Sequence, residues 1–129
     1  MGQQELSLIS MSFQISNSNI ERYSRNIILQ EIGGAGQEKL LQSKVLVVGA
    51  GGLGSPLLMY LGAAGIGNIT IVDHDKVELS NLQRQIIHSS SSIGKKKAQS
   101  AKSFINALNP EINVIDKNIK LDKSNAEKL

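Results

Sequence analysis

Apolar residues gather in separate stretches of the chain, and their spacing predicts alternating strands and helices. Short runs rich in Val, Ile and Leu at residues 45–48, 69–72 and 112–115 predict three strands. The four consecutive apolar residues at 45–48 are typical of a strand that is buried on both faces. Residues 56–64 are apolar nearly all round and predict a buried helix, whereas residues 94–108 carry a single apolar stripe. This order favours an α/β fold with flanking helices, right-handed crossovers and a parallel sheet of spatial order 3-2-1.

A glycine-rich turn follows the first predicted strand with G-x-G-x-x-G spacing, at Gly49, Gly51 and Gly54. In a nucleotide-binding turn, the first glycine permits the tight bend and the second lets phosphates approach the backbone. The third lets the helix and the strand pack closely. The helix that opens near Pro56 would point free N–H groups and a partial positive charge at a ligand over the turn. Strand, glycines and helix together predict a Rossmann-like nucleotide site.

Ionisable side chains follow the second predicted strand and precede the third. Asp73 closes the second strand, where an acidic residue receives a ribose hydroxyl in this kind of fold. Arg84 lies in the polar loop that comes next, and Lys97 is the last of three consecutive lysines at the start of a predicted helix. A cation at a helix start opposes the helix dipole by about 0.3–1 kcal/mol. An anionic ligand would explain Lys97, whereas Lys95 and Lys96 fit a solvated surface equally well.

The N-terminal region is polar and lacks a sustained period. We therefore expect a mobile tail over residues 1–17 and a domain over residues 18–129. Either Met1 or Met11 is compatible with the true start of the protein. Further local expectations are a helix over residues 20–29 capped by Ser18, a flexible break over residues 33–36, and a helix that begins at Asp122.

Composition narrows the class of protein. At 129 residues the chain is one domain, long enough for a core but short for a complete doubly wound sheet. The net charge of +3 comes with few aromatic residues, so we expect no nucleic-acid partner. There is no cysteine, and His74 and His88 stand apart, so we expect these histidines on the surface or in loops and assign no metal ligand. Neither a membrane span nor a secretory signal is recognisable, and we expect a cytoplasmic protein without a membrane partner.

Several segments match a known family when they are read together. They are E-R-Y-S-R-N at residues 21–26, V-V-G-A-G-G-L-G-S at 47–55, D-H-D at 73–75, S-N-L-Q-R-Q at 80–85 and G-K-K-K-A at 94–98. These segments resemble the ThiF/MoeB/HesA adenylyltransferases, the bacterial relatives of ubiquitin-activating enzymes. The resemblance covers about residues 20–120, and S-N-L-Q-R-Q is its most specific part. It implies a ThiF-type nucleotide-binding fold.

The resemblance also implies an activity and a set of partners. The C-terminal carboxylate of a ubiquitin-like sulfur carrier protein would attack the α-phosphate of ATP, giving an acyl-adenylate and pyrophosphate. Sulfur would then be added for molybdopterin or thiamine biosynthesis. Arg25 matches the arginine that members insert into the neighbouring protomer's site, which implies a homodimer with Arg25, Arg84 and Lys97 as catalytic residues.

The same resemblance also assigns individual residues to the phosphates and the ribose of ATP. It implies that Gly52 lies against the phosphates, that Asp73 holds the ribose, and that Asn81, Arg84 and Lys97 contact the triphosphate. The residues assigned to the nucleotide site are Gly49, Gly51, Gly52, Gly54, Asp73, Ser80, Asn81, Leu82, Gln83, Arg84 and Lys97.

The chain departs from the family after its third predicted strand. Members continue with a fourth strand whose Asp holds Mg²⁺, with the carrier-binding surface and, in many members, with C-x-x-C zinc ligands. We therefore expect a truncated form: a fragment, a degraded gene product or half of a split enzyme. Alone it should be inactive or severely impaired, and the exposed edge of the first strand should make it prone to aggregation.

Two other functions stay open on the sequence alone. The glycine turn and Asp73 also fit an NAD-dependent dehydrogenase, although a hydride-transfer site has no need of Arg25, Arg84 and Lys97. A non-catalytic nucleotide-binding or dimerisation remnant is the other alternative, and the truncation favours it. Comparing the binding of ATP with that of NAD separates the first alternative from the adenylyltransferase.

Overall fold

A small parallel sheet is the centre of the fold in this computed structural model, which describes residues 15–129. Its strands are β1 (Lys44–Val48), β2 (Asn68–Val72) and β3 (Asn113–Lys117), in the spatial order β1-β2-β3 with both pairings parallel. The predicted α/β class, the parallel sheet and the strand order are therefore confirmed. The third strand begins at Asn113 rather than at residue 112, because its first link to the neighbouring strand is the Asn113 N–H, which donates to the Gly67 carbonyl at 2.8 Å.

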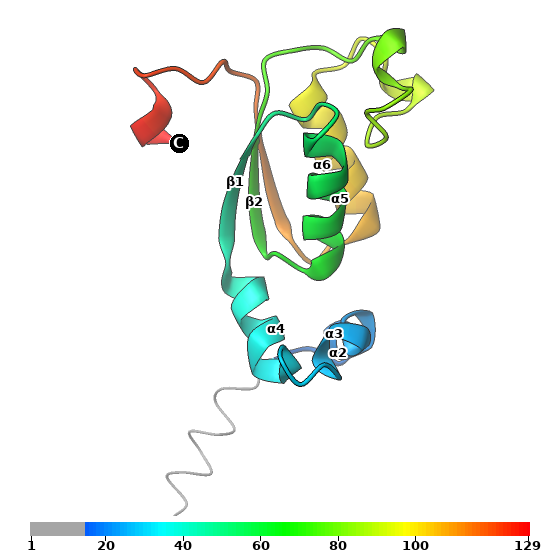
Figure 1. Cartoon of the computed structure of the whole chain (residues 1–129), viewed down its shortest axis with the longest axis vertical. Helices are drawn as coiled ribbons and strands as arrows, with labels where there is room; N and C mark the ends of the chain where they lie inside the picture. Colours follow the sequence, from blue (N-terminus) through cyan, green and yellow to red (C-terminus); the bar gives the residue numbers. More distant parts are fainter. Residues whose placement is uncertain (1–14) are drawn as a thin grey trace, which may run out of the picture.

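Two helices cover one face of the sheet (Figure 1). They are α5 (Gly54–Ala64), which follows β1, and α6 (Lys97–Leu108), which follows the long loop after β2. The core between helices and strands includes Leu58, Ile69, Ile71, Ile105 and Val114. The helix predicted over residues 94–108 begins only at Lys97, because Gly94 N–H and the Lys95 carbonyl bond to the backbone of Val77 instead, each at 2.8 Å.

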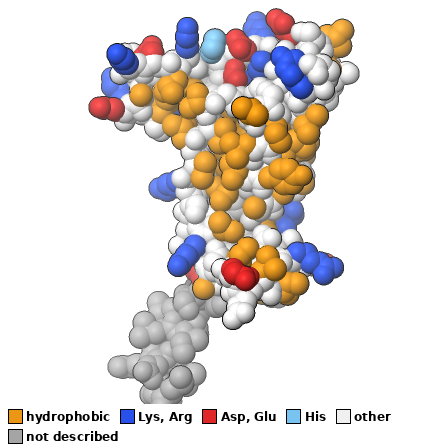
Figure 2. Space-filling model, in the orientation of Figure 1, with side chains coloured by type: hydrophobic (Ala, Val, Ile, Leu, Met, Phe, Trp, Pro, Cys, Tyr) orange, Lys and Arg blue, Asp and Glu red, His pale blue; other side chains and the backbone are white. Residues whose placement is uncertain are grey.

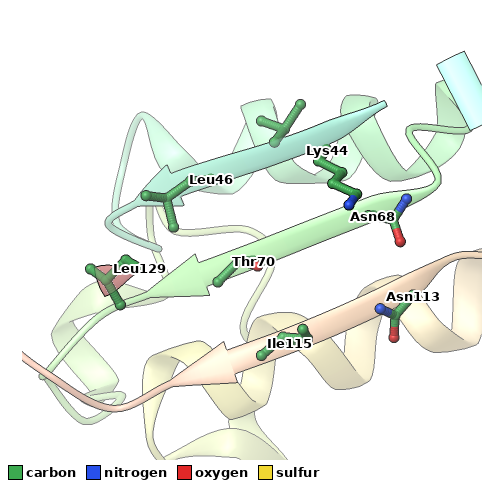
Figure 3. Close-up of a pocket in the computed structure, with 8 residues that line it drawn as sticks. Lys44, Leu46, Asn68, Thr70, Asn113, Ile115 and Leu129 are labelled. Atoms are coloured by element: carbon green, nitrogen blue, oxygen red, sulfur yellow. The ribbon is translucent and has the colours of Figure 1, made fainter. Parts of the chain in front are cut away.

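The opposite face of the sheet is open within residues 15–129. Leu46, Val48 and Ile115 are 43%, 55% and 45% exposed, whereas Val47 on the covered face is 5% exposed. The prediction that the first strand is buried on both faces is therefore wrong for the described part of the chain. A hollow of about 350 Å³ lies on this face (Figure 3), lined by Lys44, Val45, Leu46, Asn68, Thr70, Asn113, Ile115 and Leu129. None of these residues belongs to the glycine turn.

Three helices lie at the end of the sheet where β1 begins (Figure 1). They are α2 (Asn17–Arg22), α3 (Ser24–Ile27) and α4 (Gly33–Gln42). The α2 helix is capped by Ser16, whose Oγ accepts a hydrogen bond from Asn19 N–H at 3.2 Å. The predicted cap at Ser18 and the single helix over residues 20–29 are therefore wrong. Of the tail expected over residues 1–17, residues 1–14 lie outside the described part of the chain.

The glycine-rich segment at residues 33–36 forms the first turn of α4 rather than a flexible break. Glycine costs roughly 1 kcal/mol per residue in a helix relative to alanine, so packing must offset its low propensity. Gln37 supplies that packing: it is fully buried, its Nε2 donates to the Ala64 carbonyl at 3.0 Å, and its Oε1 accepts from Asn26 Nδ2 at 3.0 Å. These contacts fasten α4 to the segment of α3 and to the end of α5.

The remaining elements are single turns of 3-10 helix. η1 (Leu79–Asn81) and η2 (Ser90–Ser92) lie in the loop after β2, and η3 (Ala126–Lys128) lies near the C-terminal end. The α-helix predicted from Asp122 is wrong. Asp122 instead closes a local turn by accepting a hydrogen bond from Ser124 N–H at 2.7 Å, and only η3 follows.

Candidate functional site

The glycine turn joins the carboxyl end of β1 directly to the first turn of α5. Gly49 has a φ of +97°, a left-handed backbone conformation that residues other than glycine rarely adopt. Gly54 lies so close to Gly49 that an added Cβ would overlap the Gly49 carbonyl. The tight turn therefore delivers the N-terminal end of α5, with its free N–H groups and partial positive charge, to the end of the sheet. This end of a helix favours an anion.

Two buried polar atoms beside this turn have no hydrogen-bond partner among the described residues. They are the hydroxyl of Ser55, the second residue of α5, and the side-chain oxygen of Gln85. The side-chain nitrogen of Gln85 would lie 3.7 Å from a Cβ on Gly51, so this amide is at the turn itself. Buried polar groups are normally paired in folded proteins, and a molecule held at the turn is one way to pair them.

Asp73 lies next to the turn, at the end of β2. Its Oδ2 accepts a hydrogen bond from Ala50 N–H at 2.8 Å, and its Oδ1 accepts one from Asp75 N–H at 2.8 Å. The carboxylate is thus fixed by the backbone on both sides. Each oxygen of an ionised carboxylate can accept a second hydrogen bond, so Asp73 can also receive hydroxyl groups of a ligand.

The loop after β2 brings Arg84 over the glycine turn. The Cδ of Arg84 would lie 3.8 Å from a Cβ on Gly52, and one guanidinium nitrogen donates to the Ser80 carbonyl at 3.2 Å. Of the neighbouring residues predicted for the site, Ser80 and Gln83 have exposed side chains and Leu82 is half-buried. The structure therefore brings Gly52 and Arg84 together, as expected if both face phosphate groups.

Lys97 and Asn81 meet in a polar hollow on the same end of the sheet. Lys97 is the first residue of α6 and its side chain is only 10% exposed, with Nζ 3.9 Å from Oδ2 of Asp75. Asn81 is buried, and its Oδ1 accepts from Glu78 N–H at 2.8 Å. The hollow measures about 230 Å³ and is lined by Asp75, Lys76, Glu78, Asn81 and Lys97. Figure 2 shows charged side chains of both signs gathered at this end of the molecule.

His88 is buried under the glycine turn, which the sequence did not predict. It is 5% exposed, with Nε2 2.8 Å from the Ala50 carbonyl and Nδ1 2.7 Å from Oγ of Ser100. Burial lowers the pKa of His88, and the charge of Lys97 lowers it further, while the Ala50 carbonyl and Asp73 oppose this shift. His74 is exposed, and His88 lies in the loop after β2, as expected for a surface or loop histidine, but the burial of His88 was not predicted. The usable signal was Ser100, a polar residue on the buried side of α6 that requires a partner.

Arg25 does not join these residues within one chain. It is exposed on α3, which lies at the end of the sheet opposite the glycine turn (Figure 1). Its assignment to a neighbouring protomer's site stays a prediction.

The described residues offer no candidate for a cluster of metal ligands or for a membrane-spanning helix. Within residues 15–129, no three His, Asp or Glu side chains come together where they could hold a metal ion. In the same part of the chain, no helix combines the length and the apolar character needed to cross a membrane.

Comparison with known proteins gives one family and several relatives. A model of the ThiF family matches residues 23–129. The chain is 46% identical over 119 residues to the SAMP-activating enzyme E1 of Haloferax volcanii, covering 92% of this chain and 44% of the relative. It is 52% identical over 118 residues to the adenylyltransferase and sulfurtransferase UBA4 of Saccharomyces cerevisiae, covering 91% of this chain and 27% of the relative.

A solved structure of the same fold contains a nucleotide. The tRNA N6-threonylcarbamoyladenosine dehydratase TcdA of E. coli, in complex with ATP, aligns with a TM-score of 0.82 at 29% identity, over 88% of this chain and 46% of that one. The chain thus spans less than half the length of each of these relatives.

Proposed function

Because this chain belongs to the ThiF family, we propose that it forms the ATP-binding part of an adenylyltransferase that activates a ubiquitin-like sulfur carrier protein. The observation that carries this proposal is the meeting of the glycine turn, Asp73, Arg84 and Lys97 at one end of the sheet. An anion-binding helix end, a carboxylate and two cations are what a nucleoside triphosphate requires. The proposed pathway is molybdopterin or thiamine biosynthesis.

The proposed reaction forms one bond and breaks one. A carboxylate oxygen of the carrier attacks the α-phosphorus of ATP, the bond from that phosphorus to the bridging oxygen breaks, and pyrophosphate leaves with the electron pair. Negative charge develops on the phosphate oxygens, where positioned cations stabilise it electrostatically. Arg84 offers the planar guanidinium that pairs with two phosphate oxygens, and Lys97 offers a compact charge. Asp73 holds the ribose through the free lone pairs of its oxygens.

We further propose that catalysis needs more than one copy of this chain and more than its 129 residues. Arg25 would act in the neighbouring protomer of a homodimer, since its own site lies at the other end of the sheet. The relatives are more than twice as long, and Mg²⁺ would need ligands besides the residues described here. The isolated chain should therefore bind ATP yet catalyse little carrier-dependent exchange of pyrophosphate into ATP.

Calorimetric titration of the chain with ATP, adenosine and NAD tests the nucleotide assignment. Wild type should prefer ATP over NAD. Asp73→Ala should weaken ATP and adenosine alike, because it removes a ribose contact. Arg84→Ala should weaken ATP by about tenfold and adenosine little, as expected for one charge-assisted contact to phosphate.

Lys95 offers a matched control for Lys97 in this binding test. Lys95→Ala removes an exposed lysine two positions before Lys97 and should leave ATP binding unchanged. Tighter binding of NAD than of ATP would favour the dehydrogenase instead. If Arg84→Ala weakened ATP and adenosine equally, its assigned contact with phosphate would be contradicted, and if Asp73→Ala left adenosine binding unchanged, its assigned contact with the ribose would be contradicted.

A further inference from the structure

His88 connects the three segments that carry the candidate site. It follows the loop of Arg84, its Nε2 contacts the Ala50 carbonyl in the glycine turn at 2.8 Å, and its Nδ1 contacts Ser100 of α6 at 2.7 Å. Ser100 lies one turn after Lys97 on that helix. A single buried imidazole thus spans the space between the groups that would hold the phosphates.

Both peptide groups that flank Ala50 form hydrogen bonds with other segments. Its N–H donates to Asp73 at 2.8 Å and its carbonyl contacts His88 at 2.8 Å, and the residue itself is fully buried. The carbonyl of Ala50 and the N–H of Gly51 belong to the same planar peptide unit. Fixing that carbonyl therefore also fixes the direction of the Gly51 N–H, the middle glycine of the turn.

The partners of His88 determine which of its nitrogens carries a proton. A backbone carbonyl only accepts hydrogen bonds, so Nε2 must bear the hydrogen. Nδ1 is then free to accept the hydroxyl hydrogen of Ser100 in the neutral imidazole. The nearby charges are Lys97, which disfavours a second proton, and Asp73, which favours it. Burial favours the neutral form as well.

We propose that His88, as the neutral Nε2–H tautomer, is a positioning residue that holds the glycine turn and the first turn of α6 in register for a bound phosphate. This proposal adds a residue to the ATP site and rests on the proposed function only where phosphate affinity is concerned. His88 need not touch the nucleotide. Its effect on the ligand passes through the Ala50–Gly51 peptide and through the α6 helix that carries Lys97.

Substitutions that keep or remove the donor separate this role from simple space filling. In His88→Gln, a terminal amide nitrogen can still donate to the Ala50 carbonyl. In His88→Phe, a ring of similar shape remains but no donor does. One readout is hydrogen exchange, followed by NMR, at the amides of Gly49 and Ala50, which donate hydrogen bonds to the Val72 carbonyl and to Asp73. The other is the affinity of the full chain for ATP and adenosine.

We expect His88→Phe to speed exchange at the Gly49 and Ala50 amides by about tenfold, as expected when the turn loses one hydrogen bond. ATP binding should weaken by a similar factor, whereas adenosine binding should change little. His88→Gln should restore both properties most of the way. Ile105→Val serves as the control, because it loosens the core on α6 without touching these hydrogen bonds and should leave both readouts near wild type.

Three other outcomes are possible, and each has its own consequence for the role of His88 or for the proposed function. If the Gln and Phe variants behave alike, or if Phe leaves exchange unchanged, the positioning role is overturned. If wild type does not bind ATP, the proposed function fails, but the hydrogen-exchange data still test whether His88 holds the glycine turn. If His88→Phe does not fold, imidazole ¹⁵N spectra of wild type decide: an Nδ1–H tautomer or a charged ring at neutral pH overturns the proposal.

Discussion

The close approach of Gly54 to Gly49 predicts a large effect for the smallest possible side chain. A Cβ on Gly54 would overlap the Gly49 carbonyl oxygen and lie 2.9 Å from its carbon. Both atoms belong to the backbone of a turn that is tied to β2, since Gly49 N–H donates to the Val72 carbonyl at 2.8 Å. Neither can move without breaking the junction of strand and helix. Overpacking of this kind costs about 1–3 kcal/mol, and a rigid neighbour places Gly54→Ala at the upper end, near 3 kcal/mol.

One opposing effect reduces the expected loss of stability in Gly54→Ala. Alanine favours a helix over glycine by up to about 1 kcal/mol, but Gly54 is the first residue of α5, where this preference is only partly expressed. The net loss in the free energy of unfolding should therefore be about 2 kcal/mol or more. Urea denaturation followed by circular dichroism measures it directly.

Gly52→Ala is the matched comparison within the same turn. A Cβ on Gly52 would meet nothing closer than the flexible Arg84 side chain at 3.8 Å, so this variant should unfold within about 0.5 kcal/mol of wild type. If Gly52 faces phosphate as proposed, the same methyl group should weaken ATP binding. Equal stability of Gly54→Ala and wild type would refute the close helix–strand contact, and unchanged ATP binding in Gly52→Ala would refute the assigned place of the phosphates.

Two further predictions concern pH and assembly. Because burial lowers the pKa of His88 below its ordinary value of 6.5, the unfolded chain takes up a proton near that pH while the folded chain resists it. The free energy of unfolding should therefore be fully retained above pH 6.5 and fall as the pH drops below it, and His88→Gln should remove this part of the dependence in urea titrations at a series of pH values. If Arg25 acts in the neighbouring protomer, a mixture of Arg25→Ala and Arg84→Ala chains should contain sites that bind ATP more tightly than either variant does alone, whereas action within one chain would give no such gain.

The sequence was most informative where a structural requirement is local. The G-x-G-x-x-G spacing, the β-branched runs beside it and Asp73 at a strand end are short-range signals, and the strands and their order were predicted from them. The predictions from the sequence failed where packing between distant segments determines the local structure. Gly33 to Gly36 look like a break by propensity, yet the buried Gln37 holds this segment helical through contacts with Asn26 and Ala64.

The same distinction explains why Arg84 and Lys97 could be proposed as site residues from the sequence and why the contacts of His88 could not. Arg84 and Lys97 lie in motifs whose residue types and order are readable along the chain. The role of His88 exists only once residues 38 positions upstream and 12 positions downstream are folded against it. An isolated histidine in a sequence gives no sign of such partners, whereas a serine on the buried side of an amphipathic helix does, because its hydroxyl cannot be left unpaired at little cost. Polar residues that interrupt an apolar stripe are therefore the places to search a sequence for partners of an unexplained histidine.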